Sequence, residues 1–220
     1  MPGSDGGTTA KLQSKKRRLT PTERWKSISA SLILLMQRRY DEAVADARKA
    51  VQLAPGSADA AELASFVLTP SGYPEEAVVQ SEKAIALSPN YPAVYLGTLG
   101  NAYRLSGRTE QAIAAFKAYH ERSPGFGLTD IVIAYQETGQ PEEARRTAEQ
   151  LMAARPNFTI GGWLKTQFIR RDTARVEADA AAFAPPGCRW VEAFLAAKCM
   201  ALFGPLGRSW RGWIMSEIEE

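Results

Sequence analysis

The sequence predicts an all-α protein, a right-handed solenoid of stacked antiparallel helical hairpins. Three observations predict this fold: small and apolar residues recur at intervals of about 34 residues, a glycine ends the first helix of a unit, and a proline ends the second. Apolar residues make up 45% of the 220 residues and charged residues 23%, values typical of folded domains. The length suffices for one sizeable domain or one short repeat array.

The second helices carry the repeat most clearly. YDEAVADARKAVQLAP (40–55) and YPEEAVVQSEKAIALSP (73–89) share a pattern offset by 34 residues, which returns twice more at offsets of 35 and 32. A small residue near each helix start lets two helices approach closely, and a proline stops the helix. The small residues are Ala43, Ala77, Ala112 and Ala144, and the prolines are Pro55, Pro89, Pro124 and Pro156.

Short apolar segments between these blocks, such as 95–107 and 128–139, are the expected first helices. A glycine at the end of each permits the left-handed backbone conformation that terminates a helix. Acidic pairs begin the second helices, where they suit the positive end of the helix dipole. One hairpin cannot bury its apolar face alone, so the units must stack. The glycines are Gly72, Gly107 and Gly139, and the acidic pairs are Asp41 with Glu42, Glu75 with Glu76, and Glu142 with Glu143.

This pattern resembles the tetratricopeptide repeat. The third unit fits best, because it matches the repeat motif in order at Leu99, Gly100, Tyr103, Gly107, Ala112, Phe116 and Pro124. The resemblance implies a non-catalytic module that binds a protein or peptide in a concave groove lined by the first helices.

Whole phrases are also similar to the C-terminal repeat region of proteobacterial class III adenylate and guanylate cyclases. They are YDEAVADARKAVQLAP, SPNYPAVYLGTLGNAYRLSGRTEQAI, QPEEARRTAEQLMAARPNFTI and FIRRDTARVEADAAAF. The resemblance implies a bacterial protein in a cyclic-nucleotide signalling context. No part of the chain before the repeats is long enough for a cyclase catalytic domain, so cyclase activity is not expected.

Three regions are predicted. The first 40 residues carry nine Lys or Arg against two acidic residues, whereas the remainder has 18 basic and 22 acidic residues. A nucleic-acid-binding fold would carry its basic surplus on the fold itself, so no nucleic-acid partner is expected. The regions are a disordered basic arm (1–19), an array (20–184) with units at 24–56, 57–90, 91–124, 125–156 and a degenerate 157–184, and a helical tail (185–220).

Catalytic, cofactor and metal sites are not expected. His120 is the only histidine, and Cys188 and Cys199 are the only cysteines, too few for a zinc site. The sequence has no phosphate-binding glycine loop and no nucleophile elbow. It also has no convincing secretory signal and no apolar stretch long enough to span a bilayer, so a cytoplasmic protein is predicted.

The groove predicted by the resemblance would present polar and aromatic side chains of the first helices. Asn101 and Arg104 share one helix face, where they would hold a peptide carboxylate or backbone. The predicted groove residues are Glu62, Phe66 and Thr69 in the second unit, Gly97, Asn101 and Arg104 in the third, and Thr129, Ile133 and Gln136 in the fourth.

The tail combines many aromatic residues with Arg208 and Arg211. Three roles stay open for it: a cap on the last repeat, a homo-oligomer interface, or a helix on a membrane surface. The last two define an alternative function, a structural element that self-assembles or attaches to membranes. The aromatic residues concerned are Trp190, Phe194, Phe203, Trp210 and Trp213.

Overall fold

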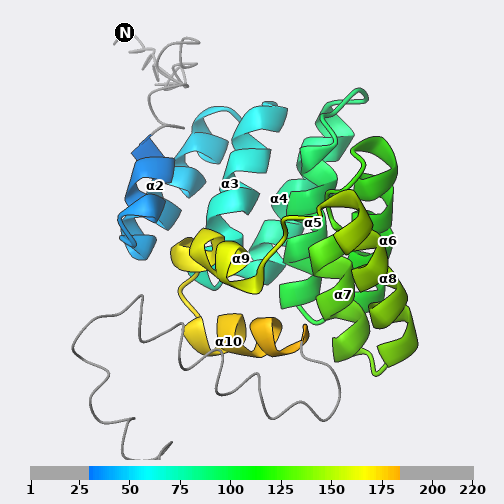
Figure 1. Ribbon diagram of the computed structural model, residues 1–220. Helices are drawn as coiled ribbons and strands as arrows, with labels where there is room; N and C mark the ends of the chain where they lie inside the picture. The colour runs from blue at the N-terminus through cyan, green and yellow to red at the C-terminus, as the bar shows by residue number, and fades with distance from the viewer. Residues whose placement is uncertain (1–29, 184–220) are drawn as a thin grey trace, which may run out of the picture.

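The computed structural model describes residues 30–183 (Figure 1). Within this range the regular structure is entirely helical, and no helix is long and apolar enough to cross a membrane. Helical residues 30–36 come first. The following elements are α2 (Tyr40–Leu53), α3 (Ala58–Ser71), α4 (Pro74–Leu87), α5 (Val94–Leu105), α6 (Thr109–Arg122), α7 (Leu128–Glu137), α8 (Pro141–Ala154), α9 (Ile160–Thr166), the 3-10 helix η1 (Gln167–Ile169) and α10 (Thr173–Ala181).

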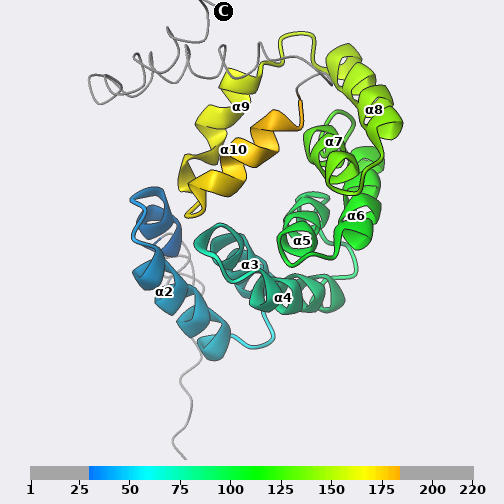
Figure 2. The same ribbon diagram turned by 90° about the horizontal axis from the view of Figure 1, so that it is seen from below.

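The hairpins α3–α4, α5–α6 and α7–α8 stack along a curve, as the repeat predicted. Figure 2 shows α3, α5 and α7 on the inner side of this curve and α4, α6 and α8 on the outer side. The first helices therefore line the concave side, and the predicted solenoid is confirmed. The arm 1–19 and the tail 185–220, with its five aromatic residues and both cysteines, lie outside the described residues.

The recurring small residues bring the helices of each hairpin together. Ala43, Ala77, Ala112 and Ala144 are all at most 1% exposed. In the third hairpin the approach is closer still, because a Cβ added to Gly100 would lie 2.5 Å from the Phe116 ring. This contact explains why the third unit requires glycine on one helix opposite an aromatic residue on the other.

The turns inside the hairpins use the predicted glycines. Gly72, Gly107 and Gly139 have φ angles of 95°, 80° and 67°, the left-handed region that favours glycine. The second helices begin with acidic first turns, and a single residue separates the end of each from a proline, again as predicted. The first helix of the fourth unit has ten residues against twelve in the third.

Two large apolar clusters form the core, with a smaller third one among α3, α4 and α5. One large cluster lies among α2, α3 and α4, and the other among α6, α7 and α8. A buried hydrogen bond of 2.6 Å between the hydroxyls of Ser65 and Ser81 joins α3 to α4. Tyr103 packs against both large clusters and so connects the two halves of the array.

The degenerate fifth unit does not continue the stack. Figure 2 shows α9 and α10 crossing the inner side of the curve, between α2 and α8. The sequence predicted that residues 157–184 would be irregular, but not that they would fold back onto the concave side. Their position decides which part of the groove is accessible.

Candidate functional site: the concave groove

Arg104 belongs to the inner helix α5 and is 1% exposed. It lies in the last turn of α5, and its guanidinium donates two hydrogen bonds to the Asp179 carboxylate of α10, at 2.8 and 2.6 Å. A third bond of 2.8 Å goes to Glu137 at the end of α7. The sequence predicted that Arg104 would hold a partner's carboxylate, whereas in this structure the carboxylate comes from the chain itself.

A charge network surrounds this pair. Asp179 also accepts hydrogen bonds from Arg170 at 2.9 Å and from Arg175 at 3.3 Å. Arg175 forms a further ion pair with Glu137. The network alternates in sign, so each buried charge has an oppositely charged neighbour.

The pKa directions agree with this arrangement. Burial opposes the charge of Arg104, but the hydrogen bonds and charge of Asp179 outweigh it and raise the Arg104 pKa. Burial would raise the pKa of Asp179, but its hydrogen bonds from Arg104 and the nearby arginine charges lower it. Both groups are therefore ionised at neutral pH.

A second attachment ties the segment to the other end of the array. The backbone N–H of Arg171 donates to the carbonyl of Pro70, at 2.9 Å, and its guanidinium donates to Asp41 of α2, at 3.0 Å. The same guanidinium lies 5.6 Å from the centre of the Tyr40 ring. Residues 170–179 thus contact α2, α3, α5 and α7.

The apolar contacts in this docking come from half-buried side chains: Ile169 packs against the cluster of α2, α3 and α4, and Phe158 and Phe183 pack against the cluster of α6, α7 and α8. None of the residues of α9 and η1 is buried, and in α10 only Asp179 and Ala180 are. The Phe183 ring lies 5.7 Å from that of Phe158 and 6.0 Å from that of Trp163, at the far end of the segment. The segment is therefore held by ion pairs with the inner helices together with half-buried apolar side chains.

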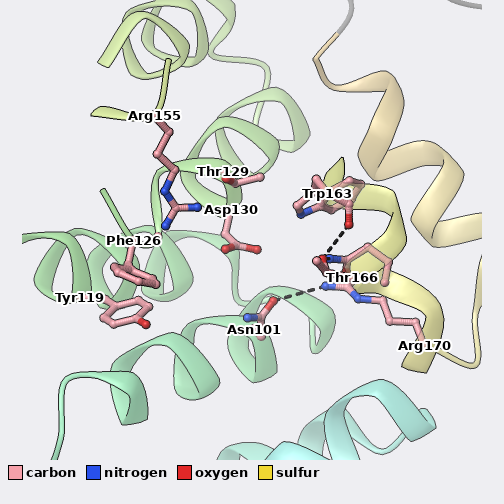
Figure 3. Close-up of a pocket in the computed structure, with 11 residues that line it drawn as sticks. Asn101, Tyr119, Phe126, Thr129, Asp130, Arg155, Trp163, Thr166 and Arg170 are labelled. Atoms are coloured by element: carbon pink, nitrogen blue, oxygen red, sulfur yellow. Dashed lines mark hydrogen bonds between the residues drawn. The ribbon is translucent and has the colours of Figure 1, made fainter. Parts of the chain in front are cut away.

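A pocket of about 240 Å³ remains between the inner helices and α9 (Figure 3). Figure 3 shows the Asp130 carboxylate and the Arg155 guanidinium facing this space. Burial raises the pKa of Asp130. The Phe126 ring lies under Arg155, at 4.8 Å, and Asn101 closes one side by accepting a hydrogen bond of 3.4 Å from Arg170. The pocket is lined by aromatic rings, by the Asp130 carboxylate and by the Arg155 guanidinium. It could therefore hold either a basic or an acidic side chain.

The predicted residues of the second unit have different environments. Phe66 is 41% exposed, while Thr69 is buried and donates to the carbonyl of Ser65. One carboxylate oxygen of Glu62 is buried without a hydrogen-bond partner in the described structure. Burial raises the pKa of Glu62 to about 7, although a hydrogen bond from Thr98 opposes the shift.

The other predicted residues divide between packing and lining. Gly97 lies against the Tyr119 ring, Ile133 is buried, and Gln136 is half-buried. Asn101 and Thr129 line the pocket. Of the nine predicted residues, Phe66 offers the clearest accessible apolar surface, and a role for any of them in partner binding stays a prediction.

The charged residues that surround Arg104 and the pocket were not predicted: Asp130, Glu137, Arg155, Arg170, Arg175 and Asp179. The sequence does contain a pattern that indicates two of these charged residues. Arg175 and Asp179 are four residues apart, a spacing that places both on one face of a helix. That spacing alone does not reveal which residues the face contacts.

The single histidine has a structural role. His120 accepts a hydrogen bond of 3.0 Å from the backbone N–H of Gly125, between α6 and α7. Within residues 30–183 no three His, Cys, Asp or Glu side chains are grouped so that they could hold a metal ion.

Comparisons with known proteins agree with the fold. Residues 93–125, which contain α5 and α6, match the family model of the tetratricopeptide repeat. A comparison with curated protein sequences gave no match.

Several solved structures are similar. PilW, described as a widely conserved type IV pilus biogenesis factor, has 18% identity and a TM-score of 0.60, over 86% of this chain and 83% of that one. The 41-end fragment of MamA from Desulfovibrio magneticus RS-1 has 18% identity and a TM-score of 0.55, over 63% and 80%. TTC0263, a thermophilic TPR protein in Thermus thermophilus, has 19% identity and a TM-score of 0.53, over 72% and 87%. At such identities the likeness concerns the fold alone. The chain therefore has the fold of a tetratricopeptide-repeat solenoid, and its third hairpin matches the sequence pattern of that repeat.

Proposed function

We propose that this chain is a non-catalytic module that binds a partner protein or peptide on its concave side. The observation that supports the proposal is the occupied state of the groove. Charged groups of the inner helices there hold a helix by its side chains, through Arg104 and Glu137. A surface that holds a helix of its own chain has the chemistry to hold one from another protein.

Phe66 marks the part of the groove where a partner would add apolar contact. It is 41% exposed on the inner helix α3. An exposed aromatic ring on a concave surface is the kind of residue that contributes strongly to protein interfaces. Val79 on the outer helix α4 is 58% exposed and provides a matched apolar control on the opposite face.

The test is quantitative affinity capture with the full chain, followed by binding measurements on the purified partner. Phe66→Ala should weaken binding of the partner at least tenfold, whereas Val79→Ala should leave it unchanged. Equal losses for both variants, or a loss for Val79→Ala alone, would move the binding site away from the groove.

The resemblance to cyclase repeat regions favours a cytoplasmic partner in a cyclic-nucleotide signalling assembly. A nucleotidyl cyclase or cyclic-nucleotide-binding protein among the groove-dependent partners would support this context. Groove-dependent partners without any such protein would remove it and leave the binding function intact.

The alternative function, self-assembly or membrane attachment through the tail, rests on aromatic residues outside the described range. It is tested by light scattering and liposome sedimentation, on the full chain and on a chain that ends at Ala184. An oligomer or liposome binding that disappears on truncation would favour the tail.

A further inference from the structure

The α10 helix presents two opposite charges to the groove, and the groove provides the two countercharges. Arg175 pairs with Glu137, and four residues later Asp179 pairs with Arg104. The two groove residues also contact each other, at 2.8 Å. The groove thus accommodates a basic residue followed, one helical turn later, by an acidic one.

We propose that α10 occupies the binding site of the partner, and that the partner supplies a helix with the same charge pattern, a Lys or Arg followed four residues later by an Asp or Glu. This helix would replace α10 on Glu137 and Arg104. The inference rests on the proposed function and adds to it the chemistry of the partner.

The burial of Arg104 makes the site selective. Its side chain is fully buried against α10, and it needs a carboxylate because an unpaired buried charge is strongly unfavourable. An apolar helix would remove α10 without supplying that carboxylate. A helix with the matching pair exchanges one set of ion pairs for an equal set, so this kind of partner lets Arg104 keep two carboxylates rather than Glu137 alone.

The segment is also attached in a way that allows exchange. Its apolar contacts come from half-buried side chains such as Ile169 and Phe183, since no residue of α9 or η1 is fully buried. Residues 155–159 connect it to α8, and the exchange of α10 would break the Arg175–Glu137 pair and the packing of Phe183 against the last hairpin. A tethered segment acts at an effective concentration of about millimolar, so a free peptide of the same sequence should bind the wild-type chain only weakly.

The experiment uses a fluorescent peptide of residues 158–183 and the full chain in four forms. Asp179→Asn removes the charge of the chain's own segment and keeps its shape. This variant should bind the wild-type peptide at least tenfold more tightly than the wild-type chain does. A peptide with the same Asp179→Asn change should lose that binding, and Arg104→Gln in the chain should abolish it.

The matched control is Glu177→Gln, in the chain and in the peptide. Glu177 lies on the same helix, is exposed, and forms no ion pair within residues 30–183. Both Glu177→Gln molecules should behave as wild type. Circular dichroism of each chain shows whether the variants remain folded.

A second measurement needs no variant of the chain. Hydrogen exchange of residues 173–181 in the wild-type chain should accelerate at least fivefold with millimolar unlabelled peptide, and remain unchanged with the Asp179→Asn peptide. No peptide binding by a folded Asp179→Asn chain, together with unchanged exchange of α10, would overturn the inference and make α10 a permanent part of the array. The proposed function would survive that outcome if Phe66→Ala still weakened partner capture. Peptide exchange without any effect of Phe66→Ala would reject the proposed function instead.

Discussion

Arg104 and Asp179 are 75 residues apart in the chain, yet their side chains form a bidentate ion pair between α5 and α10. The two guanidinium nitrogens lie 2.8 and 2.6 Å from the two carboxylate oxygens. Both side chains are at most 1% exposed. This pair connects the regular repeats to the segment that follows them, and its geometry suits a guanidinium and a carboxylate.

Replacement of Asp179 by Ala should destabilise the chain by about 3 kcal/mol, because Arg104 would stay buried without its main partner. The measurement is urea unfolding at pH 7. Glu177→Ala on the same helix should change stability by less than about 0.5 kcal/mol.

The double variant Arg104→Met with Asp179→Ala distinguishes two causes of lost stability: a buried charge without its main partner, and lost side-chain packing. It should be more stable than Asp179→Ala alone, because it no longer contains a buried guanidinium that has lost its main partner and keeps only Glu137. Additive losses in the double variant would show that the two side chains do not interact energetically.

Glu62 should make stability depend on pH near neutrality. Burial raises its pKa from the usual 4.5 to about 7 in the folded chain. Between these values the folded state holds a proton that the unfolded chain releases. The contribution of Glu62 to stability is therefore fully present below pH 4.5 and is lost as pH rises to about 7.

Glu62→Gln should remove that loss and make the chain more stable than wild type at pH 8 by about 2 kcal/mol, a shift of one pKa unit being worth about 1.4 kcal/mol and the side chain being partly exposed. Thermal unfolding from pH 5 to pH 8 measures the effect. Glu177→Gln, on an exposed side chain, should keep the wild-type slope. An unchanged slope in Glu62→Gln would show that another group titrates.

Gly100→Ala should destabilise the chain by about 2 kcal/mol, because the new methyl group would lie 2.5 Å from the Phe116 ring and force the third hairpin apart. Gly56→Ala is the control, since nothing lies within 4 Å of the corresponding position and its φ is not positive. The prediction fails if both substitutions have the same effect on the melting temperature.

Gly107→Ala tests backbone strain without crowding. Its φ is 80°, and an added Cβ would meet nothing within 4 Å. The cost should be about 1 kcal/mol, the usual penalty for an L-residue in the left-handed region. Chemical denaturation beside Gly56→Ala gives the difference.

The repeat spacing was enough to predict the solenoid because its causes are local. Alanines at hairpin contacts, glycines at turns and prolines after helices each act within one unit, and all occur where the pattern placed them. The path of residues 157–184 has another cause. It depends on contacts of Arg171 with Asp41 and of Asp179 with Arg104, between residues far apart in the chain.

The site was predicted in part for the same reason. The resemblance predicted that the first helices line the concave side, and Asn101 does line the pocket there, whereas a binding role for Phe66 stays a prediction. The resemblance gave no information on which inward residues would be covered. Arg104 was therefore expected to be available to a partner, and its own chain covers it.

An open helical array frays from its ends, because each unit touches only its neighbours. The contacts of Arg171 with Asp41 and Pro70 join the last segment to the first units across 130 and 101 positions of the chain. The two ends of the described repeats are consequently in contact, so fraying of either end would also break these contacts. Release of residues 160–183 would separate the two ends again. The array would then be less tightly curved, and amide exchange would be faster at both ends.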